Sequence, residues 1–196
     1  AMAVGPNARM MIGYAQGVPA IVERVDAACD KLGLPRDNAF MNSTLGRVYG
    51  RALDAMINVD MMVDQLQEMT NRIKNGETAT FNPEKWEPET WPSSCKGVGW
   101  VEAPRGSLSH WVRIENGQTV NYQAVVPSTW NSSGRDAEGQ MGPYEYSLAH
   151  TGTHPLVDPS RPVEPLRTIH SYDPCQSCAV HLFDEEGEAI MTRQDP

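Results

Sequence analysis

Two thiols and an imidazole follow one another at three-residue steps near the end of this chain. Cys175, Cys178 and His181 belong to the segment D-P-C-Q-S-C-A-V-H. Thiolates bind soft and borderline metal ions, and the imidazole one turn further along could serve a second ion. Asp173 is a favoured helix N-cap and Pro174 suits the first helical position. We therefore predict a helix that begins here, its dipole favouring both thiolates, and half of a metal site.

A C-x-x-C pair alone does not identify the chemistry, because it also occurs in redox-active dithiols and zinc knuckles. A thioredoxin-type dithiol follows a strand in a βαβ unit, and the sequence before Asp173 predicts no such unit. Covalent haem attachment requires a histidine directly after the second cysteine, where Ala179 stands. A zinc site could recruit Cys29 or Cys95, although neither belongs to a second C-x-x-C pair. On spacing alone the question stays open, with zinc the favoured metal.

The composition narrows the class of protein. The chain has 196 residues and a formal net charge of −9, which argues against a nucleic-acid or anionic-membrane partner. Four cysteines in a chain of this length do not form a disulfide scaffold. No apolar run approaches the roughly 18 residues of a membrane span, and the first residues lack a signal-peptide pattern. Because position 1 is not methionine, we expect a piece of a larger polypeptide, or a processed or recombinant start.

Two helical regions are expected in the first half of the chain. Residues 7–32 have helical periodicity interrupted at Gly17-Val18-Pro19, and Cys29 lies on the apolar face, where a buried thiol is expected. Residues 45–73 follow the alternating three-and-four spacing of a long packed helix that Asn75-Gly76 ends. Such helices usually pack in bundles. The chain offers few partners for this one, so we expect another chain or a missing segment to cover its apolar side.

The apolar period changes to two in the second half, which predicts a small antiparallel hairpin region and an α+β fold. Residues 108–114 and 120–126 alternate on either side of the turn E-N-G-Q, and Asn-Gly between alternating runs is a strong hairpin signal. The hairpin would bring residues 102–106 and 127–131 to the same end. Two polar loops therefore meet in space.

The remaining segments carry weaker signals. Residues 77–96 contain several Pro and Trp residues, are too apolar for a free linker, and are expected to wrap a surface. Residues 132–165 are loop-rich, with a short helix near residues 143–149. His150 and His154 are expected to be exposed loop histidines. Beyond the dithiol, the acidic turn E-E-G could join two short strands.

Four separated motifs then appear in a fixed order. They are S-T-L-G-R at 43–47, E-A-P-R-G-S-L at 102–108, N-Y-Q-A-V-V-P-S-T-W-N at 121–131 and H-S-Y-D-P-C-Q-S-C-A-V-H at 170–181. With them the chain resembles the C-terminal part of the large subunit of nickel–iron hydrogenases along nearly its whole length. The motifs are most similar to those of the respiratory, membrane-associated uptake group.

The resemblance implies a set of metal ligands. Cys175 matches a terminal nickel ligand, and Cys178 matches a thiolate that bridges nickel and iron. His181 matches the family's terminal histidine, which binds a magnesium ion, and the carbonyl of Ala124 aligns with a main-chain ligand of that ion. The implied cofactors are therefore a nickel–iron centre, with CO and CN ligands on iron, and Mg²⁺.

The resemblance also implies a pocket around the iron's diatomic ligands. Pro104 and Arg105 match residues beside the cyanides, Leu108 matches an apolar neighbour, and Ser128 matches a hydroxyl that hydrogen-bonds to cyanide. Anionic ligands in a dry pocket need charge-assisted donors, which a guanidinium and a hydroxyl provide. As a proton acceptor, a guanidinium of normal pKa is a poor base at neutral pH. We therefore favour a thiolate, Cys175 or Cys178, over Arg105.

Two departures from the family pattern affect this interpretation. The family's first dithiol, R-x-C-G-x-C, is absent, so the remaining N-terminal part of the large subunit must supply two thiolates from the same or a separate chain. Mature members end at the histidine matching His181. Residues 1–181 would therefore be the C-terminal portion of the large subunit. Residues 182–196 would be an extension that a maturation endopeptidase removes after nickel-insertion proteins have acted.

Two functions follow as hypotheses. The first is an H₂:acceptor oxidoreductase that cleaves H₂ heterolytically and passes electrons to an iron–sulfur small subunit. It would be periplasmic or membrane-associated when mature, and cytoplasmic as an unprocessed precursor. The second is a zinc-stabilised structural or maturation-interaction module that uses Cys175, Cys178 and Cys29 or Cys95. The second leaves the E-A-P-R-G and V-P-S-T-W-N loops unexplained.

Overall fold

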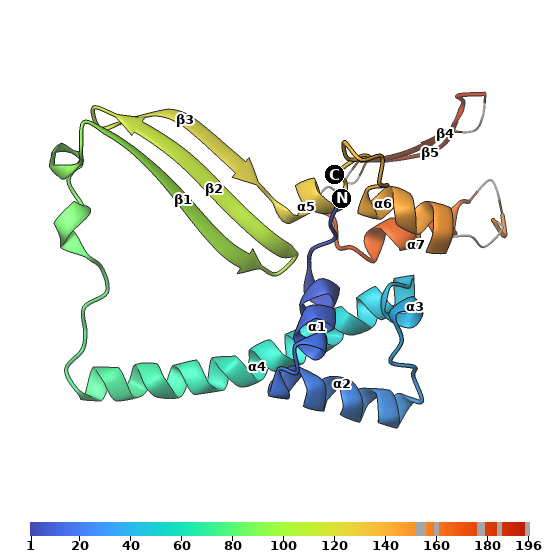
Figure 1. The fold of residues 1–196 in the computed structure, drawn as a ribbon, viewed down its shortest axis with the longest axis horizontal. Helices are drawn as coiled ribbons and strands as arrows, with labels where there is room; N and C mark the ends of the chain where they lie inside the picture. Colours follow the sequence, from blue (N-terminus) through green and yellow to red (C-terminus); the bar gives the residue numbers. More distant parts are fainter. Residues whose placement is uncertain (152–155, 159–160, 176–178, 184–185, 195–196) are drawn as a thin grey trace.

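The computed structural model describes residues 1–151, 156–158, 161–175, 179–183 and 186–194. The first part of the chain forms helices, and a three-stranded antiparallel sheet follows them and lies apart from them (Figure 1). A two-stranded hairpin projects near the C-terminus. This arrangement agrees with the predicted α+β class. No helix of the described residues is long and apolar enough to cross a membrane.

The first helical region is split as predicted. Helices α1 (Pro6–Ala15) and α2 (Pro19–Leu32) each begin with proline, whose missing N–H costs nothing at a helix start. Gly33 ends α2 in the left-handed region, with φ 63°. Cys29 is 1% exposed, which confirms the buried thiol, and its Sγ lies 3.3 Å from the hydroxyl oxygen of Tyr49. Burial raises the pKa of Tyr49, so this phenol stays neutral.

Helix α4 (Thr44–Lys74) confirms the long helix and follows the short α3 (Asn38–Met41). Ser43 caps it by accepting a hydrogen bond from the Gly46 N–H at 3.0 Å. The buried residues of α4 all lie in its first third: Gly46, Arg47, Tyr49, Gly50 and Leu53. The core they share with α1 and α2 contains Met10, Val25, Cys29, Met41, Tyr49 and Leu53.

The apolar side predicted for α4, where apolar residues recur at alternating three- and four-residue steps (the apolar seam), is not its packed face within the described residues. Val59, Met62 and Leu66 stay about 60% exposed, as do other seam residues towards the C-terminal end. Instead, the small residues beside the seam let α1 approach, because a Cβ on Gly50 would lie 2.9 Å from the Cα of Asn7. Figure 1 shows the C-terminal half of α4 extending beyond the other helices. The cover expected from elsewhere stays a prediction.

The sheet confirms the predicted hairpin and adds a strand. Strands β1 (Ser94–Ala103), β2 (Gly106–Glu115) and β3 (Gln118–Val125) are antiparallel in the order β1-β2-β3. Asn116 and Gly117 turn β2 into β3 with φ 49° and 74°, as the favoured two-residue hairpin turn requires. Two residues, Pro104 and Arg105, connect β1 to β2, since Ala103 pairs with Gly106. We call this connection the Arg105 turn.

The Pro- and Trp-rich connection ahead of β1 contains two 3₁₀ turns, Pro83–Lys85 and Pro88–Thr90. Trp86 is exposed, so the connection does not wrap a surface along its whole length. Its second half lies against the hairpin turn, where Pro88 packs on Gly117 and Ser93 accepts a hydrogen bond from the Asn116 N–H at 2.8 Å. The expectation that this connection covers a surface therefore holds for that half alone within the described residues.

After β3 come α5 (Pro127–Asn131), α6 (Pro143–Tyr146) and α7 (Val163–His170), with a π-helical turn at Ser147–Thr151. The short helix expected near residues 143–149 is therefore present. His150 lies exposed in the π-helical turn, and His154 lies outside the described residues. Strands β4 (Ala179–Phe183) and β5 (Ala189–Gln194) pair antiparallel and confirm the strand–turn–strand prediction for the tail.

The prediction that a helix begins at Asp173 is wrong. Asp173 has φ 54° and its N–H donates to the His170 carbonyl at 2.9 Å, so it closes the end of α7. Pro174 follows at the position where proline commonly stands beyond a helix end. Aspartate tolerates the left-handed region as well as an N-cap, and the sequence does not distinguish the two uses. Further on, Ala179–Phe183 is a strand. The helix-dipole argument for Cys175 therefore lapses.

Candidate metal centre

The Arg105 turn reaches the segment that carries the dithiol. The Nε of Arg105 donates to the carbonyl oxygen of Asp173 at 3.1 Å and lies 3.5 Å from its carboxylate Oδ2. Both side chains are partly exposed, so this ion pair contributes little stability by itself. Its effect is to place a guanidinium two residues from Cys175.

A second contact fixes Cys175 from the other loop. Ser128 lies in the first turn of α5, directly after Pro127, and is buried. Its Oγ accepts a hydrogen bond from the Cys175 N–H at 3.1 Å. The hydroxyl therefore keeps its own proton for a further acceptor. The Cys175 thiol is free and exposed, and Cys178 lies outside the described residues.

The predicted meeting of the two loops is confirmed. Residues 102–106 and 127–131 lie at the same end of the sheet, because Ser109 in β2 pairs with Val125 in β3. Through Arg105 and Ser128 both loops bind the segment from Asp173 to Cys175. A cation, a hydroxyl and a thiol are therefore brought together from three separate parts of the chain.

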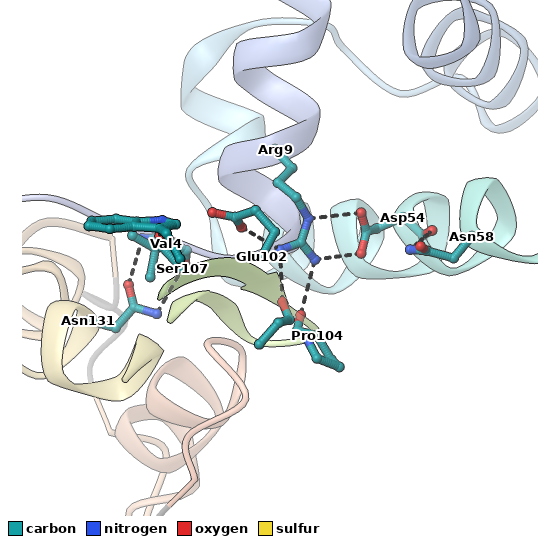
Figure 2. A network of polar contacts seen from close by, with 10 residues as sticks. Val4, Arg9, Asp54, Asn58, Glu102, Pro104, Ser107 and Asn131 are labelled. Carbon is teal, nitrogen blue, oxygen red and sulfur yellow. Dashed lines mark hydrogen bonds and ion pairs between the residues drawn. The ribbon is translucent and has the colours of Figure 1, made fainter. Parts of the chain in front are cut away.

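Arg9 of α1 also binds the Arg105 turn, through the Pro104 carbonyl (Figure 2). Its guanidinium donates to both oxygens of Asp54 in α4, at 3.1 Å from Nε and 2.7 Å from Nη2. Its other N–H groups donate to Glu102 Oε2 at 3.0 Å and to the carbonyls of Ala103 and Pro104, both at 3.1 Å. Burial lowers the pKa of Arg9, but the hydrogen bonds to the two carboxylates outweigh it and raise the pKa overall. All five donors are engaged.

The segment before α1 connects the two loops to each other. The Asn131 side chain of α5 is buried and accepts from the Val4 N–H at 2.9 Å while donating to the Val4 carbonyl at 3.1 Å (Figure 2). Gly5 packs main chain to main chain on the Arg105 turn, because a Cβ on Gly5 would lie 2.9 Å from the Arg105 carbonyl oxygen. Gly5 and Gly106 have φ 121° and 134°, so a side chain at either would also be strained. One short segment thus sets the distance between the loops.

The other residues implied by the resemblance lie in strands. Leu108 is half-buried in β2, opposite Val101, and Ala124 lies in β3, opposite His110. His181 is exposed in β4, which projects on the far side of α5 from the sheet (Figure 1). No group of three or more His, Cys, Asp or Glu residues that could hold a metal ion occurs among the described residues. The magnesium ligands are therefore not assembled within them.

The chain is similar in sequence to known proteins over nearly its whole length. The model of the family described as nickel-dependent hydrogenase matches residues 1–181. The chain belongs to the nickel-dependent hydrogenase family. It is 43% identical, over 98% of its length, to the uptake hydrogenase large subunit of Rubrivivax gelatinosus. It is 44% identical, over 99% of its length, to the hydrogenase-1 large chain of Escherichia coli.

Solved hydrogenases have the same fold. The Ni-Fe-Se hydrogenase of Desulfomicrobium baculatum, in a reduced, active form, matches 90% of this chain with a TM-score of 0.63 and 27% identity. A variant of the [NiFeSe] hydrogenase of Desulfovibrio vulgaris Hildenborough matches 90% with a TM-score of 0.61 and 28% identity. The chain covers only 34–35% of those chains and 32–34% of the two relatives above. It therefore spans about a third of the length of the relatives it matches.

The sequence did not reveal the residues that hold this candidate site in place. Arg9 is one arginine on a helix, and its five acceptors come from α4, the end of β1 and Pro104. Asn131 is the last residue of a motif that was singled out for Ala124 and Ser128. The Asp173 carbonyl, which Arg105 binds, was hidden by the expectation of an N-cap at that residue. The only usable signal was V-G-P ahead of α1, which marks a tight main-chain approach.

Proposed function

We propose that this chain is the C-terminal part of the catalytic large subunit of a nickel–iron hydrogenase, an H₂:acceptor oxidoreductase. The observation that carries the proposal is the convergence of Arg105 and Ser128 on the segment Asp173–Cys175, in a chain whose family match runs from residue 1 to residue 181. An uptake direction is supported by the relative from Rubrivivax gelatinosus, which is an uptake hydrogenase large subunit.

The described donors fit a thiolate-held nickel–iron centre with anionic ligands. Cys175 and Cys178 would hold the metals together with two thiolates from the rest of the large subunit. The bound centre would supply heterolytic cleavage of H₂. The Arg105 guanidinium and the Ser128 hydroxyl would donate to the cyanides on iron, beside CO, in a pocket bordered by Pro104 and Leu108. The Ser128 proton is available because its oxygen acts as acceptor towards Cys175.

Proton movement would begin at a thiolate rather than at Arg105. The Arg105 guanidinium acts as a donor here: its Nε donates to the Asp173 carbonyl and lies 3.5 Å from the Asp173 carboxylate. A guanidinium that stays protonated orients anions and excludes water but accepts no proton. Cys175 carries an exposed, unpaired thiol at the point where both loops meet. We therefore assign the acceptor role to Cys175 or Cys178.

The finer assignments belong to the same proposal. His181 and the Ala124 carbonyl would bind Mg²⁺ once the rest of the large subunit is in place. Electrons would pass to an iron–sulfur small subunit, and the mature enzyme would be periplasmic or membrane-associated. Residues 182–196 would be removed by a maturation endopeptidase after nickel insertion. The end of the family match at residue 181 supports this boundary, which divides strand β4.

The zinc-module alternative has less support. Cys29 is buried in the helical core beside Tyr49. Cys95 pairs with Ile114 at the far end of β1. At about 3.4 Å per residue, that end lies roughly 25–30 Å from the Arg105 turn. Recruiting either thiol would require a rearrangement of the helical core or of the sheet.

Metal analysis of the complete, mature subunit tests the proposed function. We expect nickel and iron in equal amounts and H₂-dependent reduction of a dye acceptor. Stoichiometric zinc without nickel, together with unfolding on chelation, would instead establish the structural module.

A further inference from the structure

A pocket of about 250 Å³ lies between α1, the start of α4 and the turn after α7. Its polar lining consists of Asn7, Asn42, Arg47, Arg51, Ser171 and Tyr172. The rest of the wall is apolar and comes from α1 and the residues before it. Two cationic side chains therefore face one pocket whose lining includes no acidic residue.

Arg47 is a buried charge without a charged partner. It is 6% exposed, and its Nε donates to the Ser171 hydroxyl at 2.6 Å. Its other donors meet the Asn42 carbonyl and the Thr44 hydroxyl, and its Cζ lies 4.3 Å from the ring centre of Tyr172. Burial lowers the pKa of Arg47, as expected for a cation that only neutral groups solvate. No ion pair involves it among the described residues.

Arg51 adds a second cation at the same place. Its Nη2 donates to the Ser171 carbonyl at 2.6 Å, so both guanidiniums are attached to one residue. The Nε of Arg51 is buried and has no hydrogen-bond partner in the described chain. A buried donor left unpaired is costly, and two like charges in a low-dielectric site repel each other. The pocket therefore lacks an anionic acceptor.

We propose that this pocket binds the carboxylate of an acidic side chain from the part of the large subunit outside this chain. A carboxylate offers about four acceptor positions, enough to reach both guanidiniums. The apolar wall suits the methylene stem of a glutamate or aspartate better than a phosphate, whose oxygens would all need donors. The relatives are about three times as long as this chain, so a family member has about two thirds of its length outside the matched part from which such a side chain could come.

The consequence concerns the metal segment. Ser171 receives hydrogen bonds from both arginines and lies four residues before Cys175. A carboxylate that neutralises the arginines would fix Ser171 and Tyr172, and with them the approach of the thiol-bearing segment to Arg105 and Ser128. The pocket would thus couple docking of the rest of the subunit to assembly of the site. Both the ion pair and this consequence rest on the proposed function, since they assign the chain to a longer large subunit.

Zero-length cross-linking in the complete subunit tests the proposal. The variant Arg51→Lys places an amine in the pocket, and a carbodiimide joins an amine to a carboxylate only at contact distance. Arg9→Lys is the matched control, because the Arg9–Asp54 pair is 2.7 Å apart and similarly sheltered. We expect mass spectrometry to find residue 9 joined to Asp54 and residue 51 joined to an acidic residue outside residues 1–196.

A control that reacts while residue 51 stays unmodified, or joins only to residues 1–196, would overturn the proposal. A second measurement covers poor reagent access. Arg51→Met would leave the incoming carboxylate with Arg47 as its one remaining cation, so the loss of Tm should be larger at pH 8 than at pH 5, where that carboxylate can take up a proton. A loss of Tm that does not vary with pH would show that the pocket binds no carboxylate. A wild-type Tm that rises with added acetate would show that the pocket takes a free anion instead; either result would overturn the proposal. Nickel content of the same samples reports separately on the proposed function.

Discussion

Replacing Arg9 by alanine should loosen the Arg105 turn before it unfolds the protein. The substitution removes five hydrogen bonds that join α1 to Asp54 and to the end of β1. It leaves the Asp54 carboxylate, whose side chain is only 13% exposed, without its guanidinium. Within the described residues, the hydrogen bond from Arg9 is the one that ties the Pro104 carbonyl to the helices.

The magnitude follows from the burial of the pair. Breaking a fully buried ion pair costs about 3–5 kcal/mol, whereas an exposed pair contributes about 0–1 kcal/mol. The Arg9 side chain is 22% exposed, which places this pair between the limits, and we expect a loss of about 2–3 kcal/mol. Arg9→Lys keeps the charge but offers three donors without the fork, so about half of the loss should remain.

Two readouts separate positioning from general stability. Urea unfolding of the complete subunit gives the free-energy loss, with Arg72→Ala as the control, since the Arg72–Glu68 pair is exposed and should contribute less than about 0.5 kcal/mol. Hydrogen–deuterium exchange should rise in the peptide covering residues 103–107 more than in the peptide covering the Asn116-Gly117 turn. The reasoning is refuted if Arg9→Ala matches Arg72→Ala in stability, or if exchange rises equally in both peptides.

Three further outcomes are expected. Asp26→Asn should make the free energy of unfolding depend less on pH below about pH 4. Hydrogen bonds from Arg36 and Tyr14 lower the pKa of Asp26 below its usual 3.8, so its contribution to stability is complete above about pH 4 and is lost as the pH falls further. Acid titration of the native and variant proteins, followed by circular dichroism, checks this. Ser128→Ala should speed alkylation of Cys175 in the metal-free subunit, because the main-chain N–H of Cys175 loses its acceptor, whereas Ser128→Thr should keep the native rate; equal rates for all three would contradict this. Gly50→Ala should lower the free energy of unfolding by about 1–3 kcal/mol, because its Cβ would overlap α1 at Asn7. Gly99→Ala is the control: it has open space around it, so thermal unfolding should place it within about 0.5 kcal/mol of the native protein.

The sequence predicted those elements whose signals are local. Gly17-Val18-Pro19 divides α1 from α2, Gly33 ends α2, and Asn116-Gly117 turns the hairpin, each through the backbone preference of its residue type. The meeting of residues 102–106 with residues 127–131 followed from antiparallel pairing alone. These predictions needed no knowledge of distant contacts.

The failures come from long-range packing and from ambiguous residues. The apolar seam of α4 suggested the packed face, yet α1 packs beside it, because small residues such as Gly50 permit a close approach. Asp173 was interpreted as a helix start, although Asp followed by Pro also ends a helix, and only the preceding α7 decides between the two. Arg47 is buried by the turn after α7, more than 120 residues away in sequence, which its own motif S-T-L-G-R does not indicate.

The sequence identified the residues of the candidate site by their type and order, but it did not identify the residues that hold them in place. Arg105, Ser128 and Cys175 stand in motifs specific enough to name in advance, and the structure joins them through Asp173 and the Cys175 main chain. Arg9 and Asn131 act through contacts that are 45 to 127 residues away in sequence, which no local pattern encodes. Cys178, by contrast, lies outside the described residues, and its role stays a prediction.

The most direct test of the central claim is the nickel content of the complete subunit in which Cys175 is replaced by serine, beside Cys29→Ser as the matched control. Both substitutions remove one thiol, but Cys29 lies in the helical core beside Tyr49. We expect elemental analysis to find nickel lost from Cys175→Ser and retained, per folded subunit, in Cys29→Ser. Nickel retained at the native level in Cys175→Ser would contradict the assignment of this thiol to the metal centre.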